Sequence, residues 1–263
     1  MKTLENSNHV KSILKAFLII EALDKEVEMS IGEISETLDM DKGTVHRLVN
    51  TIKDAGYITQ NPDNRKYANS LKLFAMGSRV VEKTGVKQIA RPFVEQLAKE
   101  TKETVNLGLR IGGNIIYIDK IESNSTIKVG IDIGVSIPDY CTGMGKAVIA
   151  FLTVEERDEI FKDCDFQGYA PNTVTNREDL ESRLRVVREK GYSKDDEEFV
   201  GGLISFGAPI FDYHGKPVAA ISVSCPKYRY EESVDKNYFS SRVVQVALEI
   251  SKQLGYRPKG YKV

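Results

Sequence analysis

The chain has 263 residues, of which 41% are hydrophobic and 29% charged, and its formal net charge is −1. This length suits two domains with a real hydrophobic core, and the balanced charge excludes a chain that binds nucleic acid through net charge alone. The sequence shows no signal-peptide core and no apolar run that would cross a membrane, and its three scattered cysteines predict no disulfide framework. We therefore expect a cytoplasmic protein with no membrane partner.

The first 55 residues predict three helices. Residues 10–23 repeat apolar side chains at helical spacing, and SIGEISETL opens with Ser30 followed by Glu33, the capping-box pattern of a helix start. After the short connection DMDK, a third helix follows, and its apolar stripe is Val45, Leu48, Val49 and Ile52. A short helix, a tight turn and a helix with a compact polar face predict a helix-turn-helix.

A small hairpin is predicted directly after the third helix. Gly56 is expected to end the helix, and residues 57–60 can pair with residues 66–68 around a turn at residues 61–64. A hairpin in this place is a wing, so the N-terminal unit is predicted to be a winged helix-turn-helix.

Polar residues on the third helix and on the wing are the predicted DNA contacts. Arg47 suits guanine or a phosphate and Asn50 suits adenine, while Thr44 and the first helical amides suit a phosphate. Gly43 would let the helix backbone approach DNA closely, and Arg65 would reach the minor groove or its phosphates. The full set is Lys42, Gly43, Thr44, His46, Arg47, Asn50, Arg65 and Lys66. The alternative is a winged helix that binds proteins, with this polar face only solvated.

Residues 69–85 predict a linker helix with one apolar side, formed by Leu73, Phe74, Gly77, Val80 and Val81. Such a side needs a partner. In a homodimer the partner is the same helix of a second copy, and two recognition helices then face a pseudo-palindromic site. The alternative is that the linker helix packs on its own C-terminal domain.

From residue 86 onward, helices and strands mix. An amphipathic helix in VKQIARPFVEQLAKET leads to two strands joined by a turn at residues 112–114. Residues 127–137 alternate strictly between apolar and other residues and predict a long strand closed by Pro138. The segment DYCTGMGKAVIAFL then turns into a helix.

The rest of the chain predicts three more helices and a strand pair. Two helices have capping boxes, Thr153 with Glu156 and Thr175 with Glu178. The strands GGLISFGAPIF and PVAAISVSC are joined at DYHGK, and a last amphipathic helix carries Val243, Val246, Ala247, Ile250 and Leu254. The C-terminal unit is therefore expected to be an α+β domain with an antiparallel sheet.

Catalytic and metal chemistry have weak support. His214 with Cys141 or Cys225 is the one conceivable nucleophile pair, and nothing in the sequence marks either cysteine as activated. The cysteines and His214 lack the paired spacing of zinc ligands, and no nucleotide-binding fingerprint is present. We expect no enzyme, no metal and no cofactor.

Four segments in order resemble the IclR family of transcriptional regulators: GTVHRLVNTIKDAGYI, TGMGKAVIAFL, REKGYSKDDEEFVGGLISFGAPIF and PVAAISVSCP. The resemblance covers nearly the whole chain. It implies a winged helix-turn-helix at residues 1–68, a linker helix at 69–85 and a GAF-like effector-binding domain at 86–263. It also implies a regulator, here expected to be a repressor, that binds double-stranded operator DNA as a dimer or as a dimer of dimers. RKYANS departs from the family because it lacks the Arg-Leu-Gly ending common at the wing's exit.

The resemblance also implies control by a small organic acid. The residues themselves suggest one place for it: glycines and amides before a helix that begins near Lys146 attract a carboxylate, although the same residues also suit a plain turn. Ser222 and Ser224 direct two hydroxyls to one strand face, where local backbone bonds are the alternative. Asp195, within an acidic run that is usually a solvated loop, and Ser205 are added from the resemblance.

The expected effector residues are Thr142, Gly143, Met144, Gly145, Asp195, Ser205, Ser222 and Ser224, with apolar walls from Ile204, Phe206 and Met144. The expected mechanism is that the acid reorders residues 139–146 and the strand pair. This would change the spacing of the recognition helices and hence the affinity for the operator.

Overall fold

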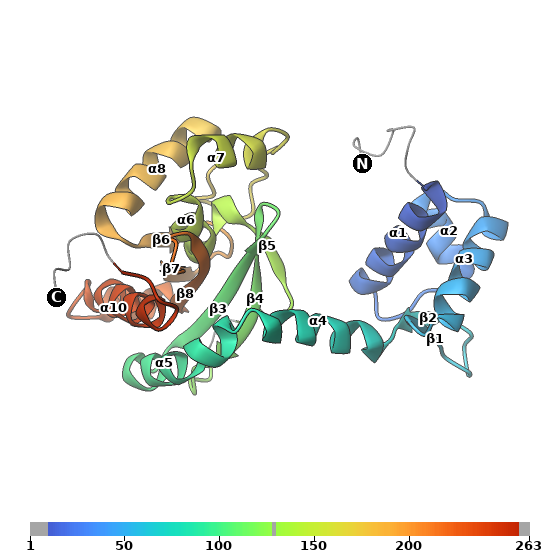
Figure 1. Cartoon of the computed structure of the whole chain (residues 1–263), viewed down its shortest axis with the longest axis horizontal. Coiled ribbons are helices and arrows are strands. Elements are labelled where there is room, and N and C mark those ends of the chain that lie inside the picture. Colours follow the sequence, from blue (N-terminus) through green and yellow to red (C-terminus); the bar gives the residue numbers. More distant parts are fainter. Residues whose placement is uncertain (1–9, 128–129, 258–263) are drawn as a thin grey trace. The chain divides into compact units, whose positions relative to one another are not determined.

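A computed structural model describes residues 10–127 and 130–257. The chain divides into two compact units, one ending at Lys83 and the other beginning at Thr84. Figure 1 shows both, and each is described by itself.

The first unit is a three-helix bundle with a hairpin and a further helix. Its elements are α1 (Lys11–Lys25), α2 (Ile31–Leu38), α3 (Lys42–Asp54), β1 (Ile58–Gln60), β2 (Tyr67–Asn69) and α4 (Leu71–Lys83). The apolar stripes of α1, α2 and α3 meet in one core around Ile19, Ile34 and Val49. The capping box of Ser30 and Glu33 is present at the start of α2. The winged helix-turn-helix predicted from the sequence is therefore confirmed.

The second unit is built on one antiparallel sheet of six strands in the order β5-β4-β3-β8-β7-β6. Its strands are β3 (Thr104–Ile111), β4 (Asn114–Ile121), β5 (Ser136–Pro138), β6 (Ser193–Asp196), β7 (Leu203–Phe211) and β8 (Pro217–Pro226). Its helices are α5 (Val86–Thr101), η1 (Asp139–Cys141), α6 (Gly143–Ile149), α7 (Val154–Phe161), α8 (Arg177–Lys190), α9 (Lys227–Glu232) and α10 (Tyr238–Gln253). The predicted α+β architecture is confirmed.

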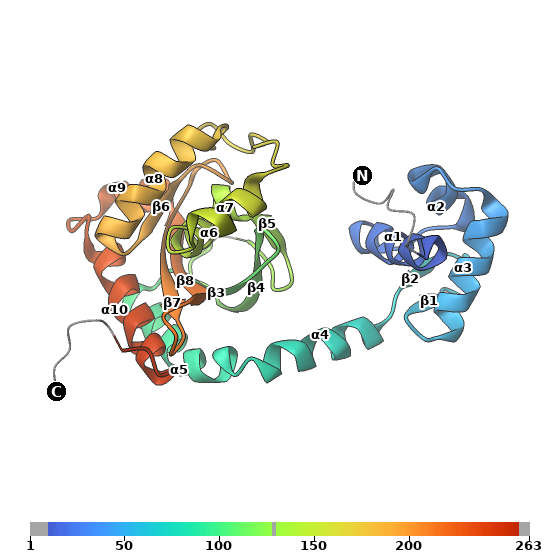
Figure 2. The same ribbon diagram turned by 45° about the horizontal axis from the view of Figure 1, so that its top comes forward.

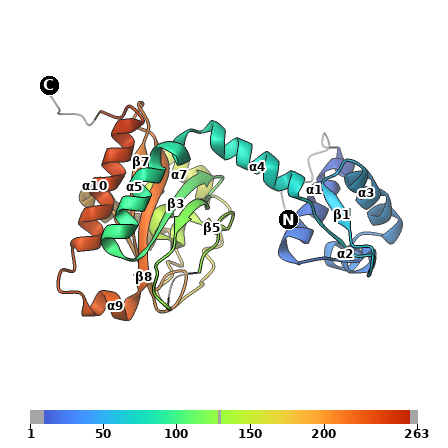
Figure 3. The same ribbon diagram turned by 90° about the horizontal axis from the view of Figure 1, so that it is seen from below.

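Helices cover both faces of this sheet. Figure 3 shows α5 and α10 side by side on one face, and both pack on the central strands. On the other face the sheet curves around α6, which packs on β7 and β8 with α8 behind it (Figure 2). Because strand side chains alternate between faces, each strand residue is assigned to the α6 side or to the α10 side.

The long strand predicted for residues 127–137 is wrong for the described part of that segment. Only Ser136–Pro138 pairs with β4 as a strand, and residues 128 and 129 lie outside the described residues. Gly134 has a φ of +93°, so the chain turns there instead of continuing along β4. The alternating side chains Ile133 and Val135 are 53% and 41% exposed, whereas Ile137 in β5 is buried, so the alternation does not mark one continuous buried face.

Two further expectations change in detail. The helix α8 is capped by Asn176, which accepts a hydrogen bond from the Asp179 amide, and not by the predicted box of Thr175 and Glu178. The strand β6 lies in SKDDEEF, where the acidic run indicated a solvated loop, and α9 was not predicted.

Other predicted features of the second unit are confirmed. They are the hairpin β3–β4, the strand pair β7–β8 and the capping box of Thr153 and Glu156.

Candidate nucleic-acid interface and effector site

The surface of α3 opposite its core stripe holds the predicted DNA contacts. Val45, Val49 and Ile52 face the core, whereas Lys42, Gly43, His46 and Arg47 are exposed, and Thr44 and Asn50 are half-buried. The Asn50 Nδ2 atom lies 3.3 Å from the His46 Nδ1 atom, one helical turn away. The structure thus brings the predicted base-contacting residues onto one exposed helix face.

The N-terminus of α3 is already capped by a carboxylate. The Thr44 amide donates a hydrogen bond of 2.8 Å to Asp41 Oδ1, and bonds from the Thr44 hydroxyl and amide lower the pKa of Asp41. The Thr44 amide is therefore engaged within the protein, contrary to the expectation that it is open to a phosphate. Among the predicted residues, the exposed cation at this end of α3 is Lys42.

The wing is tied to the helical bundle by Glu28 and Glu33. Glu28 accepts hydrogen bonds from the side-chain amides of Asn61 and Asn64 at the turn. Lys66 Nζ lies 2.9 Å from Glu33 Oε1, so one of the two predicted wing cations is already paired. Arg65 is exposed at the return of the wing and has a left-handed backbone with a φ of +61°.

The helix α4 has no buried residue within the single chain. Leu71, Phe74 and Val80 are 83%, 71% and 63% exposed. The helix α1 also leaves large apolar side chains in solvent, since Ile13 and Phe17 are more than half exposed. Exposed apolar surface of this kind is typical of a contact site.

In the second unit, two rows of polar residues cross the sheet. Asp195 on β6 pairs with Ser205 on β7, which pairs with Ser224 on β8, which pairs with Thr104 on β3. The next row on the same face runs Ser193, Gly207, Ser222 and Asn106. All eight residues are buried. The sheet thus brings together Asp195, Ser205, Ser222 and Ser224, which are far apart in the sequence.

The start of α6 lies directly on these rows. A Cβ atom on Gly143 would lie 2.7 Å from Ser205 Oγ, so glycine is required for this close approach. The helix begins at Gly143, earlier than the predicted start near Lys146, and Thr142 caps it by accepting a hydrogen bond of 2.9 Å from the Gly145 amide. Residues 142–145, expected to precede the helix, are its buried N-cap and first turn.

Asn106 is a member of this cluster that the sequence did not single out. Its Nδ2 atom lies 3.4 Å from Ser222 Oγ and 3.3 Å from Ser224 Oγ, and its buried Oδ1 atom has no hydrogen-bond partner among the described residues. The available signal was a polar residue in the middle of the apolar strand TVNLGLRI.

Asp195 is the ionisable group of the cluster. It is 3% exposed, and its Oδ1 atom accepts a hydrogen bond of 2.9 Å from the Glu198 amide. Burial raises the pKa of Asp195 to about 7, while Lys146 acts in the opposite direction. At neutral pH this carboxyl group is therefore able to donate a hydrogen bond as well as to accept one.

The predicted apolar walls are partly wrong. Ile204 and Phe206 alternate with Ser205 and so face away from it, and the ring of Phe206 lies 6.3 Å from the ring of Phe239 on α10. Met144 does lie on the polar side of the sheet, where its thioether approaches Gly108. Two of the three expected wall residues therefore belong to the opposite layer.

The chemistry of an enzyme is not supported by the cysteines. Burial raises the pKa of Cys225 to about 12 and raises that of Cys141 further, which is the opposite of thiolate activation. Within residues 10–127 and 130–257, no group of three or more His, Cys, Asp and Glu side chains could hold a metal ion. No helix of this part of the chain combines the length and apolar character that a membrane span requires.

A winged helix-turn-helix joined to a domain with a buried polar cluster defines a two-domain DNA-binding regulator. Residues 12–62 match the IclR helix-turn-helix domain, and residues 78–252 match the family described as bacterial transcriptional regulator IclR C-terminal. The chain therefore belongs to the IclR family of transcriptional regulators, a family of DNA-binding proteins and not of enzymes.

Relatives align over most of this chain. The transcriptional regulator KdgR of Escherichia coli is 35% identical over 94% of both chains, and the repressor AllR of Salmonella typhimurium is 32% identical over 87% of this chain and 84% of its own. The crystal structure of the Thermotoga maritima IclR protein superposes with a TM-score of 0.71 at 32% identity, over 94% of this chain and all of that one.

Proposed function

We propose that this regulator is a repressor that binds a pseudo-palindromic operator as a homodimer and leaves it when a small organic acid binds the buried polar cluster. DNA binding follows from the family. The choice of repression is supported by the relative named as a repressor, and the remaining parts rest on the geometry of this chain.

The exposed face of α3 supports direct base reading. Arg47 and Asn50 are the two side-chain types that pair bidentately with guanine and adenine in the major groove, and both project from the face opposite the core. Lys42 and Arg65 would hold phosphates on either side of that contact. Lys66 is expected to contribute less to DNA affinity than Arg65, because Glu33 already pairs with it.

The exposed apolar sides of α1 and α4 support dimerisation. A protein whose first 70 residues contain slightly more acidic than basic side chains gains little DNA affinity from charge alone. Joining two copies adds a second recognition helix to the same duplex, and the overall affinity rises because the second helix binds at a high effective concentration. A two-fold dimer is thus the arrangement that makes α3 an effective reader.

The orphan acceptor of Asn106 is the observation that carries the effector site. Buried polar groups in native proteins almost always have partners, so the unpaired Asn106 Oδ1 atom beside two serine hydroxyls is an environment that a polar ligand would complete. A protonated Asp195 and the two serine hydroxyls offer donors to a carboxylate, and Asn106 Oδ1 offers an acceptor to a hydroxyl group of the same acid. Thr142, Gly143, Met144 and Gly145 cover the cluster from the start of α6.

Selection of duplexes from a random library with the purified full-length chain tests the DNA part. The expected result is a two-fold related consensus that is bound at 150 mM salt in preference to competitor. The selected duplex is then challenged with a panel of small mono- and dicarboxylic acids. Release by one class of acid from the native protein, and not from a Ser222→Ala, Ser224→Ala double variant, supports the effector site. Equal release from both proteins would place the acid elsewhere, and failure to enrich any duplex would contradict operator binding.

A further inference from the structure

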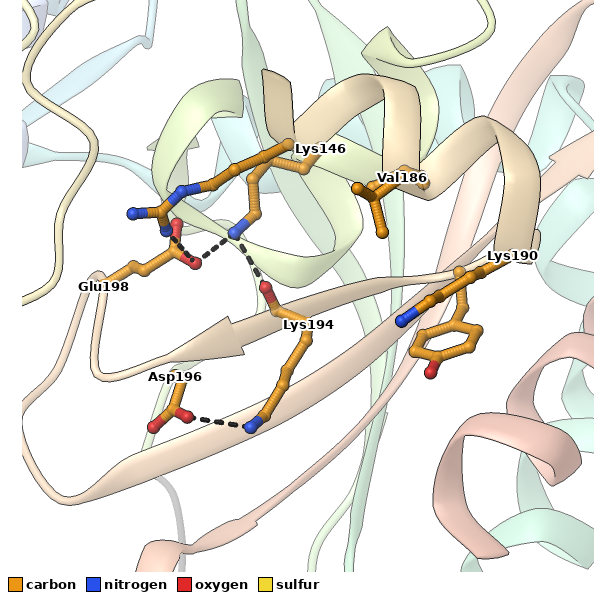
Figure 4. A pocket seen from close by; sticks show the side chains of 9 residues that line it. Lys146, Val186, Lys190, Lys194, Asp196 and Glu198 are labelled. Carbon is orange, nitrogen blue, oxygen red and sulfur yellow. Dashed lines mark hydrogen bonds and ion pairs between the residues drawn. The ribbon is translucent and has the colours of Figure 1, made fainter. Parts of the chain in front are cut away.

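A pocket opens between α8 and the outer edge of β6 (Figure 4). Its volume is about 290 Å³, room for a small metabolite. The lining residues are Lys146, Arg183, Val186, Val187, Lys190, Tyr192, Lys194, Asp196 and Glu198. None of them belongs to the two polar rows described above.

The strand β6 is the last strand of the sheet, so one of its edges has no neighbouring strand in the described part of the chain. The pocket lies at this free edge, away from the two polar rows. The backbone carbonyls of Lys194 and Asp196 point outward, where they accept hydrogen bonds from Lys146 Nζ (2.8 Å) and Asn172 Nδ2 (2.9 Å). Ser193 and Asp195, at the alternate positions, turn their side chains toward the start of α6. The pocket and the polar cluster therefore lie on different sides of one strand.

Cations outnumber acids in the lining, with four of the former and two of the latter. Glu198, 2% exposed, pairs with two of them, the buried ammonium of Lys146 and the guanidinium of Arg183. Asp196 also has two partners, Lys194 from inside the pocket and Lys227 from outside it, each at 2.8 Å. If a ligand displaced one cation from Glu198 or from Asp196, the second cation would still pair with that carboxylate.

Lys190 is the cation of the pocket that has no acidic partner among the described residues. It ends α8, and it has no salt bridge with any residue in the described ranges 10–127 and 130–257. Figure 4 shows its side chain extending into the pocket with no dashed line to a neighbour, on the same side as Val186. Lys194, joined to Asp196 in the same view, is the next nitrogen available to a ligand.

We propose that this pocket binds a small dianion, a dicarboxylate or a phosphate, between Lys190 and Lys194, with Arg183 as a third contact. Two negative charges match the surplus of two positive charges, and charge-assisted hydrogen bonds to ammonium and guanidinium groups are the strong ones. Val186 and Val187 supply an apolar wall for the carbon chain of a dicarboxylate. Lys194 exchanges Asp196 for the ligand, and Lys227 stays with Asp196.

The site is connected to the polar cluster through two residues. Lys146 belongs to α6, whose first turn covers the cluster, and the Glu198 amide donates to Asp195. An anion that draws Arg183 away from Glu198 strengthens the hold of Glu198 on Lys146. Occupation of the pocket is therefore expected to change the affinity of the polar cluster for its own ligand.

Isothermal titration of the full-length protein with malonate, and separately with inorganic phosphate, tests the site at constant ionic strength. The expected result is saturable binding that weakens about tenfold or more in a Lys190→Gln, Lys194→Gln double variant. Malonate alone binding identifies the dicarboxylate class, and phosphate alone identifies the phosphate class. A Val186→Trp variant, which fills the space without altering charge, is expected to abolish binding while the thermal unfolding curve stays cooperative.

Two controls separate this site from the effector site. A Lys99→Gln variant removes an exposed lysine on α5 and should bind like the native chain. The Ser222→Ala, Ser224→Ala variant should also keep its affinity for the dianion, whatever its response to the operator-releasing acid. Loss of binding in the serine variant with retention in the lysine variant would overturn the proposal, as would failure of both anions to bind the native protein.

Discussion

Gly143 at the start of α6 and Gly207 in the middle of β7 touch backbone to backbone: a Cβ atom on Gly207 would lie 2.4 Å from the Gly143 carbonyl carbon. No side chain fits between them, so the helix rests directly on β7, where Ser205 belongs to one polar row and Gly207 to the next. This contact fixes where the first turn of α6 lies over the candidate effector cluster.

A Gly207→Ala substitution is expected to lower the free energy of unfolding by on the order of 2–4 kcal/mol. The added methyl group meets backbone atoms of α6, which have no rotamer to change, so the helix must move as a unit. Gly201→Ala is the matched control, because nothing lies within 4 Å of the Cβ position there. Urea unfolding of the three proteins measures the difference, and an unchanged midpoint for Gly207→Ala would show that α6 moves freely on the sheet.

The buried carboxyl group of Asp195 predicts a pH-dependent stability. Its pKa is about 7 in the folded chain and near 4 in an unfolded one, so folding favours the protonated form. The stability associated with that proton is present at low pH and is lost as the pH rises through 7. Asp195→Asn, which resembles the protonated group, should therefore gain about 2–3 kcal/mol relative to the native chain between pH 5 and pH 8.

Urea unfolding at the two pH values measures this gain. Asp54→Asn, at the exposed end of α3, is the control and should show the same small difference from the native chain at both. Asp139 is also buried, and burial raises its pKa to about 6, so the native chain alone cannot isolate Asp195. A difference for Asp195→Asn that is independent of pH would contradict a raised pKa at this position.

The exposed side of α4 predicts a dimer that one charge can break. Phe74 is 71% exposed in the single chain, and a glutamate in its place would bury a charge in the proposed contact. Phe74→Glu is expected to shift sedimentation equilibrium toward the monomer by tenfold or more in the dissociation constant, by about 1.4 kcal/mol or more. Ala75→Glu adds the same charge on the opposite side of α4 and should leave assembly intact. Equal behaviour of the two variants would mean that this side of α4 is not the dimer contact.

The elements that sequence periodicity predicted well are those whose apolar residues face a core within their own unit. The stripe of α3 at Val45, Val49 and Ile52 is buried as expected, because a 3.6-residue period has one inward side. The alternation at residues 131–137 misled because a regular period shows which side chains share a face and not whether anything covers that face. Gly134 turns the chain at a point that the apolar pattern does not mark.

The candidate effector cluster was only partly predictable for a related reason. Ser222 and Ser224 share a strand, so their common face follows from a period of two, whereas the neighbours of that strand depend on sheet order. Asn106 reaches the serines only because β3 lies next to β8, more than a hundred residues away in the chain. The same alternation excludes Ile204 and Phe206 as wall residues once Ser205 is placed on the α6 side.

Arg47 and Lys42 on α3 are expected to differ in what they contribute to operator binding. Arg47→Ala should cost about 1–3 kcal/mol for the selected duplex and relax the preference at one base position, as expected for the loss of a guanidinium that pairs with one base edge. Lys42→Ala should weaken selected and random duplexes alike and reduce the slope of log affinity against log salt by about one, as expected for one lost phosphate contact. Fluorescence anisotropy with both duplexes at several salt concentrations measures each effect, and Lys99→Ala in the second unit serves as the charge control. If Arg47→Ala instead weakens both duplexes equally, Arg47 holds the backbone, and reading by this helix falls to His46 and Asn50.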